Sequence, residues 1–249
     1  GAGTADQWAG AATGPGNWRE TLCRIEGPAC LDLPDGFADN WLDATGQRLA
    51  GPVMPSSAGT TDILTTLSTD RLRPTGIERL FDAAIATATE RLWITTAYFV
   101  PTAEHINALN AAAARGVDVR VLTNGPHTNH KLTRLAGQAS YEVLIENGVR
   151  IYEYQHTVLH VKLITVDGQW ATIGSANFDS RSLVLNDELN ISITGADFVR
   201  PLDRQFIQDI KISKHISIAY WQRRHWYDRL LEASSRALAL NYSKIPHEL

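Results

Sequence analysis

The sequence predicts an α/β fold with a mixed central β-sheet and helices on both faces. From about residue 62 onward, short runs with strand character alternate with amphipathic segments of helical length. Gly116 and Gly148 close two of those segments, as glycine often does after a helix. A chain of 249 residues is long enough to bury a substantial core.

The first part of the chain has weaker patterns. Residues 1–20 are rich in Gly, Ala and Thr and indicate a loop. Residues 22–25 suggest a strand, and an amphipathic helix that follows is expected to end near Trp41, with Gly46 as its C-cap. Gly, Pro and Ser are dense in residues 46–61, which predicts a linker.

From residue 62 the elements follow from apolar periodicity. Ile77, Phe81 and Ile85 lie on one face of a helix, whereas the β-branched and aromatic run RLWITTAYF indicates a strand. The last sixty residues have mostly helical patterns. The expected strands are residues 63–68, 91–99, 117–123, 149–154, 158–166, 170–174 and 185–194, and the expected helices are residues 74–89, 102–115 and 132–147.

Composition narrows the function classes. Hydrophobic residues make up 44% of the chain and charged residues 20%, as in ordinary globular proteins. The net charge of −4 argues against a non-specific nucleic-acid binder, which normally has a basic excess. Cys23 and Cys30 form neither a C-x-x-C pair nor a zinc-binding pattern. No apolar run reaches the roughly 18 residues that a membrane span requires.

One motif carries the chemistry. His160, Lys162 and Asp167 form the pattern H-x-K-x4-D, and a G-S-x-N turn with Ser175 and Asn177 follows. Side chains two residues apart on a strand point the same way, so the imidazole and the ammonium should face one site. An imidazole can attack phosphorus or move a proton, while Lys, Ser and Asn stabilise the phosphate oxygens. The motif therefore predicts cleavage or exchange of a phosphodiester.

Three charged residues after the motif have two interpretations each. Glu188 is placed either to hold the His160 imidazole in one tautomer, as the carboxylate of a triad does, or as a solvated strand carboxylate. Asp179 and Arg181 are expected to form structural ion pairs behind the loop, and direct contact with substrate is the alternative.

Two further residues are candidates for substrate binding. Tyr98 follows a predicted strand and either lines a lipid entrance or packs in the core. His130 shares a loop with His127 and Asn129, and this loop either contacts a glycerol headgroup or phosphate, or is simply a solvated polar loop.

The motif resembles that of the phospholipase D superfamily. Residues 95–125 and 148–190 closely resemble the second half of bacterial cardiolipin synthases of the phospholipase D type. Residues 17–46, with NWRETLCRIEGPACLDL, resemble the segment that follows the first motif of those enzymes. The resemblance implies that residues 59–249 are a catalytic half with C-terminal helices, and that residues 1–58 are the end of a first half plus a linker.

The resemblance also implies a function. In that family two such motifs meet, one histidine forms a phosphohistidine, and the other protonates the leaving alcohol. The expected reaction converts phosphatidylglycerol to cardiolipin and glycerol, without a metal or other cofactor. Family precedent usually makes the first-motif histidine the nucleophile, which leaves the acid role to His160, but the sequence keeps both roles open. By position, the implied catalytic residues are His160, Lys162, Asp167, Ser175, Asn177 and Glu188.

This chain contains the H-x-K spacing once. A fragment would take its second motif from upstream and would be weak or inactive alone; alternatively, two copies pair to form one site. The alternative functions are a hydrolytic phospholipase D, a phosphodiesterase acting on DNA, and an inactive interaction domain. The expected partners are a phosphatidylglycerol-like lipid and the cytoplasmic membrane of a bacterium. Residues 219–240, rich in Trp and Arg, either lie on the membrane or dock against the domain.

Overall fold

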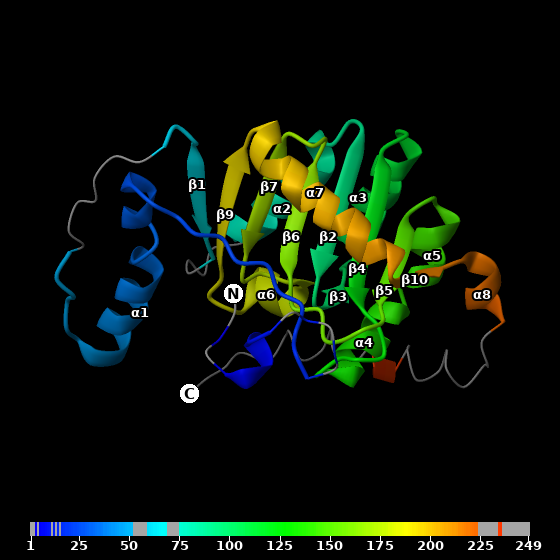
Figure 1. Cartoon of the computed structure of the whole chain (residues 1–249), viewed down its shortest axis with the longest axis horizontal. Helices are drawn as coiled ribbons and strands as arrows, with labels where there is room; N and C mark the ends of the chain where they lie inside the picture. The colour runs from blue at the N-terminus through cyan, green and yellow to red at the C-terminus, as the bar shows by residue number, and fades with distance from the viewer. Residues whose placement is uncertain are drawn as a thin grey trace.

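The computed structural model describes residues 3, 5–10, 12, 14, 16–51, 59–68, 75–223 and 234–235. Its centre is a mixed sheet of eight strands (Figure 1). The neighbouring strands β2, β4 and β5 are parallel, and the other pairs are antiparallel. In spatial order the strands are β1 (Ile63–Leu67), β9 (Leu189–Thr194), β7 (Trp170–Gly174), β6 (Lys162–Val166), β2 (Arg91–Thr96), β4 (Asp118–Asn124), β5 (Arg150–Tyr154) and β10 (Ser213–Ile216).

Helices cover both faces of this sheet, as the sequence predicts. Helix α7 crosses one face diagonally, and α2 and α3 lie behind the other (Figure 1). A short parallel pair, β3 (Phe99–Val100) with β8 (Phe178–Asp179), forms a second sheet. The α-helices are α1 (Asp35–Thr45), α2 (Gly76–Thr87), α3 (Ala103–Ala114), α4 (Lys131–Gln138), α5 (Tyr141–Glu146), α6 (Ser180–Val184), α7 (Ala196–Lys211) and α8 (Ile218–Gln222), and two 3-10 turns are η1 (Asp6–Trp8) and η2 (Pro28–Leu31).

Each face of the sheet has its own apolar core. Under α2 and α3, the predicted helix face with Ile77 and Phe81 is fully buried against the strands. Under α7, Phe206 stacks on Trp93 with ring centroids 5.0 Å apart. Cys23 and Ile25, from the N-terminal segment, pack against this second core. The segment that precedes the linker therefore shares its packing with the α/β region.

The structure corrects several element boundaries. Residues 22–25 are not a strand, because this segment packs on the α7 core without a ladder partner; the isolated bridge nearby joins Arg19, which precedes the segment, to Leu159. The predicted helix over 132–147 divides into α4 and α5, where the Ser140 hydroxyl and backbone N–H both bond the Gly137 carbonyl. A serine that bonds nearby backbone competes with helix continuation.

The predicted strand over 158–166 begins only at Lys162, because residues before it pair with the N-terminal segment instead of with the sheet. Strand β10 lies within the region expected to be helical. In the predicted helical tail 219–240, the structure describes the end of α8 through Arg223 and residues 234–235; the remainder lies outside the described residues. Among the helices described, none combines the length and apolar character needed to cross a bilayer.

Candidate active site

All the motif residues except Asp167 lie at the end of the sheet where β6 begins. His160 lies two residues before the start of this strand, and its backbone N–H donates to the Arg19 carbonyl at 2.8 Å. The buried Asn124 amide clamps the preceding residue: its oxygen accepts from Leu159 N at 2.7 Å, and its nitrogen donates to Leu159 O at 2.9 Å. The backbone at His160 and at the residue before it is therefore held by Arg19 and Asn124, neither of which belongs to the motif.

His160 and Lys162 face one another, as the spacing predicts. The Lys162 ammonium lies 2.8 Å from His160 Nδ1 and 3.0 Å from Nε2, and donates to the His160 carbonyl at 2.6 Å. Burial lowers the pKa of Lys162 to about 8, against the carboxylates of Glu20, Glu188 and Asp179, which raise it. The site thus holds a cation, only 5% exposed, directly beside an imidazole.

Glu20 completes the surroundings of the imidazole. His160 Nδ1 lies 2.8 Å from Glu20 Oε2, in a hydrogen bond that orients the ring. Burial lowers the pKa of His160; the Glu20 hydrogen bond opposes this shift, and the Lys162 charge adds to it. Trp8 contacts the ring edge-on at 4.8 Å between centroids, and Trp18 lies tilted at 5.4 Å. Sequence reasoning missed Glu20, because it lies 140 residues before His160 in a segment without regular structure.

The expected orienting role of Glu188 is not what the structure displays. Its carboxylate accepts a hydrogen bond from the Asn186 amide at 3.2 Å, and Glu20 occupies the position on His160 Nδ1. Glu188 is nonetheless buried, and its charge raises the pKa of Lys162. It therefore belongs to the same charged cluster without contacting the imidazole nitrogen.

The G-S-x-N turn lies beside this cluster. A Cβ at Gly174 would approach the Leu189 carbonyl to 2.2 Å, so only glycine fits between β7 and β9. The Ser175 hydroxyl accepts from Leu189 N at 3.0 Å, which ties the turn to β9. Asn177 is 8% exposed, and its Oδ1 is buried without a hydrogen-bond partner among the described residues. Such an atom is destabilising by roughly 1–3 kcal/mol unless a ligand satisfies it.

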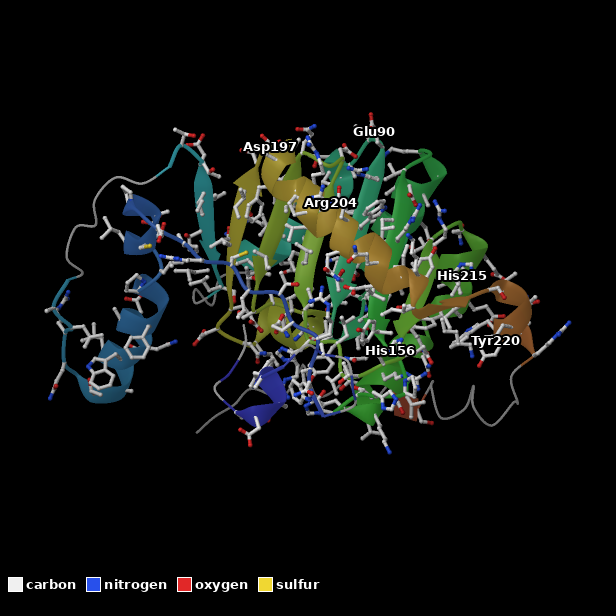
Figure 2. All side chains as sticks on the ribbon, viewed as in Figure 1. Glu90, His156, Asp197, Arg204, His215 and Tyr220 are labelled. Carbon is white, nitrogen blue, oxygen red and sulfur yellow. The ribbon has the colours of Figure 1, made fainter. Side chains whose placement is uncertain are left out.

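Asp167 is the one motif residue that the structure places elsewhere. It lies in the left-handed region, with φ of 53°, in the turn between β6 and β7. Its carboxylate accepts bonds from the backbone N–H groups of Thr89, Glu90 and Arg91 and from the Thr89 hydroxyl, at 2.7–3.0 Å. It lies five residue steps along the chain from Lys162, or about 17 Å at the rise of an extended strand. Glu90, at the upper edge of the sheet in Figure 2, marks this end, and His156, near the lower edge, marks the other.

A cavity of about 380 Å³ adjoins the site. Asn177 lines it, and so do the two proposed substrate-binding residues, Tyr98 and His130, whose rings meet edge-on at 5.3 Å. Asp179 and Arg181 line it as well, although the sequence favoured a place for them behind the loop. The structure thus brings the outlying candidates to one cavity that touches the motif at Asn177.

Asp179 is the most perturbed carboxyl group in this cavity. It is 8% exposed, and its Oδ1 caps α6 by accepting from Ser182 N at 2.9 Å. Burial raises its pKa to about 6, with backbone hydrogen bonds from Ser182 and Arg181 in opposition and Glu188 in support. Throughout the part of the chain that the structure describes, no cluster of His, Cys, Asp or Glu side chains is arranged to hold a metal ion.

Comparison with known proteins identifies relatives of this chain. A family described as "Cardiolipin synthase, PLD-like domain" matches residues 81–210, which are 130 of the 249 residues. A cardiolipin synthase of Geobacillus kaustophilus is 33% identical over 231 residues, which cover 90% of this chain and 45% of that protein. The chain therefore spans about half the length of the curated relatives that it matches.

Solved structures show the same fold at low identity. Phosphatidylserine synthase of Haemophilus influenzae matches with a TM-score of 0.58 and 13% identity, covering 82% of this chain and 51% of that one. Nuc of Salmonella typhimurium, a phospholipase D family member, matches with a TM-score of 0.54 and 19% identity, covering 64% of this chain and 99% of that one. These similarities establish the fold, and the sheet flanked by helices is the shared feature.

Proposed function

Because the chain belongs to the PLD-like domain family of cardiolipin synthases, we propose that it supplies the His160 half of a phosphatidyl-transfer site. The observation that carries the proposal is the pairing of the His160 imidazole with the buried Lys162 ammonium, within 3.0 Å of both ring nitrogens. A reactive imidazole, the Lys162 ammonium and the Asn177 amide meet the needs of a phosphodiester whose oxygens gain charge during attack.

The proposed reaction has two steps. A histidine nitrogen forms a bond to phosphorus as the bond from phosphorus to the glycerol oxygen breaks, and a second histidine protonates that oxygen. The hydroxyl of a second phosphatidylglycerol then attacks phosphorus, breaks the P–N bond and yields cardiolipin, while its proton returns to the second histidine. Covalent catalysis of this kind divides one difficult displacement into two easier ones.

Glu20 supports His160 in either role. Its hydrogen bond from Nδ1–H leaves the lone pair on Nε2, which lies 3.0 Å from the Lys162 ammonium, as the one that would meet the phosphorus or the proton. The nucleophile must be neutral, whereas the acid must carry a proton. The lowered pKa of His160 supports the neutral form. Trapping the covalent intermediate and locating it on a peptide separates the two roles.

We further propose that the second histidine comes from an upstream half or from another copy, and that the complete protein works at a bacterial membrane. The H-x-K spacing occurs once in this sequence, which supports a second contributor. The curated cardiolipin synthases that the chain resembles are bacterial, and a phospholipid substrate supports a membrane surface as the place of work.

The test is turnover of vesicles that contain radiolabelled phosphatidylglycerol by the natural-length protein. The expected products are labelled cardiolipin and glycerol, and His160→Asn should abolish both. The matched control is His215→Asn, an exposed histidine on the edge strand β10 and remote from the site (Figure 2).

Three outcomes count against the proposal. Phosphatidate as the main product would identify a hydrolase, and cleavage of DNA with no lipid turnover would identify a nuclease. Lipid turnover that survives His160→Asn would remove this histidine from the chemistry altogether.

A further inference from the structure

We propose that the cavity beside Asn177 binds the acceptor in the transfer reaction, a polyol that carries a phosphodiester, and that Asp179 and Arg181 recognise it. This inference rests on the proposed function and assigns the second substrate to its own subsite. His160 is not among the residues that line the cavity, whereas Asn177 belongs to both the cavity and the motif. An acceptor there would lie next to the phosphorus without occupying its place.

The size of the cavity fits a headgroup. Its volume of about 380 Å³ is at the lower end of the range for small-molecule sites. Water alone, as the acceptor of a hydrolase, needs no cavity of this size. A glycerol unit with an attached phosphodiester is the part of a second lipid that must approach the reacting centre.

Buried polar atoms in the cavity suit hydroxyl groups. Asn177 Oδ1 has no hydrogen-bond partner among the described residues, although the side chain is more than nine-tenths buried. Asp179 offers a carboxylate at the same wall, with one oxygen already engaged by Ser182 N. Acceptors of this kind bind the O–H donors of neighbouring hydroxyls, and a carboxylate makes the stronger bonds.

A cation supplies selectivity for the phosphodiester. Arg181 is exposed and lines the cavity, and it lies near enough to Asp179 for its charge to lower the pKa of that carboxyl. A guanidinium binds phosphate oxygens in a bidentate manner. Tyr98, whose hydroxyl donates to Asn129 Oδ1 at 2.9 Å, adds a further polar side chain to the lining of the cavity. Carboxylate and guanidinium side by side match a ligand with hydroxyls at one end and an anion at the other.

The experiment offers water-soluble acceptors to the natural-length protein with labelled phosphatidylglycerol as donor. Glycerophosphoglycerol, glycerol and 1-propanol are compared by the ratio of transfer to hydrolysis. Asp179→Asn, which keeps a residue able to cap α6, should lower this ratio about tenfold for glycerophosphoglycerol and glycerol, as expected for one lost charge-assisted bond. Arg181→Gln should remove the preference for glycerophosphoglycerol over glycerol.

Asp187→Asn is the matched control, since Asp187 is an exposed carboxylate near the site that does not line the cavity. Its ratio should equal that of the wild type. The inference is overturned if Asp179→Asn leaves the ratio unchanged, or if the preference for glycerophosphoglycerol survives Arg181→Gln. If Asp179→Asn does not fold, Tyr98→Phe, which removes one hydroxyl from the cavity, is tested in its place. An unchanged ratio of transfer to hydrolysis in Tyr98→Phe would also count against the acceptor subsite.

A binding measurement tests the acceptor subsite independently of the proposed transfer reaction. Titration of this chain with glycerophosphoglycerol, followed by NMR, should shift the resonances of Asn177 and Tyr98 without any turnover. Shifts in this chain, together with no transfer activity in the natural-length protein, would retain the subsite and reject the function. Transfer activity without such shifts would retain the function and reject the subsite.

Discussion

The two ends of strand β6 carry residues of one motif but work in different ways. At the first end, Lys162 is buried beside the His160 imidazole, and burial lowers the pKa values of both groups. At the other end, Asp167 is bound by four donors from residues 89–91, and its pKa is lowered. The first arrangement buries two ionisable groups where their charged forms are disfavoured. The second surrounds one carboxylate with hydrogen-bond donors that favour its charged form. We call the first the reactive end, after its proposed role, and the second the architectural end.

The largest expected effect is at the reactive end. Lys162→Met removes the cation that we propose faces the phosphate, and we expect kcat/KM for phosphatidyl transfer to fall by at least about 10³-fold. The free energy of unfolding should not fall, because methionine packs in the same space without a buried charge. Lipid turnover and urea denaturation measure the two quantities. Unaltered turnover would place the phosphate elsewhere.

The architectural end should respond in stability. Asp167→Asn keeps a residue that tolerates the left-handed conformation but replaces the carboxylate that four donors share. We expect the free energy of unfolding to fall by about 2–3 kcal/mol at pH 7, measured by urea denaturation. Burial alone would raise the pKa of Asp167, but the bonds from Arg91, Thr89 and Glu90 lower it by more.

The sign of the pH effect follows from that shift. A carboxylate with a lowered pKa in the folded state stabilises the protein fully above its unfolded pKa, and this contribution is lost as pH falls through the folded value. The difference between wild type and Asp167→Asn should therefore shrink below about pH 4. A difference that stays constant down to pH 2 would contradict the carboxylate's role.

Glu20→Gln tests whether the N-terminal segment belongs to the reactive end. The variant keeps a side chain that can accept from His160 Nδ1 but removes the charge that raises the pKa of this imidazole. If His160 acts in its neutral form, the acidic limb of the pH–rate profile should move to lower pH, and turnover at its optimum should drop about tenfold. The control is Glu26→Gln, an exposed carboxylate in the same segment. A pH–rate profile equal to that of the wild type would show that Glu20 does not act through His160.

The smallest expected effect is a gain in stability. Burial raises the pKa of Asp179 to about 6, so its stabilising contribution is present below about pH 4 and is lost as pH rises through 6. Asp179→Asn should therefore increase the free energy of unfolding at pH 8 by about 1 kcal/mol, after the weaker helix cap is allowed for. Thermal unfolding at pH 4 and pH 8 measures it, and a loss of stability at pH 8 would show that the carboxylate is structural.

The fold was largely predictable because its elements have strong local signals. The helix face with Ile77, Phe81 and Ile85 is buried as expected, and Gly46 closes α1 in the left-handed conformation. Errors arose where non-local contacts decide the structure. Residues before Lys162 have strand character but pair with Arg19 rather than with the sheet, and no periodicity encodes that choice.

The candidate site divides in the same way. The sequence correctly predicted that His160 and Lys162 lie together, because side chains two residues apart on an extended segment point to the same face. The carboxylate on the imidazole is Glu20 rather than Glu188, since the order of residues in space depends on how the N-terminal segment crosses the sheet. The common cavity of Tyr98, His130 and Asn177 has the same origin, because three separate connections form it.

The most direct test compares turnover per folded molecule in two variants of the natural-length protein. At a temperature where circular dichroism shows both variants folded, Asp167→Asn should transfer phosphatidyl groups within about threefold of the wild type, whereas His160→Asn should lose at least about 10³-fold. Such a result would separate an architectural end of β6 from a reactive one. A fully folded Asp167→Asn protein that is as inactive as His160→Asn would contradict the account.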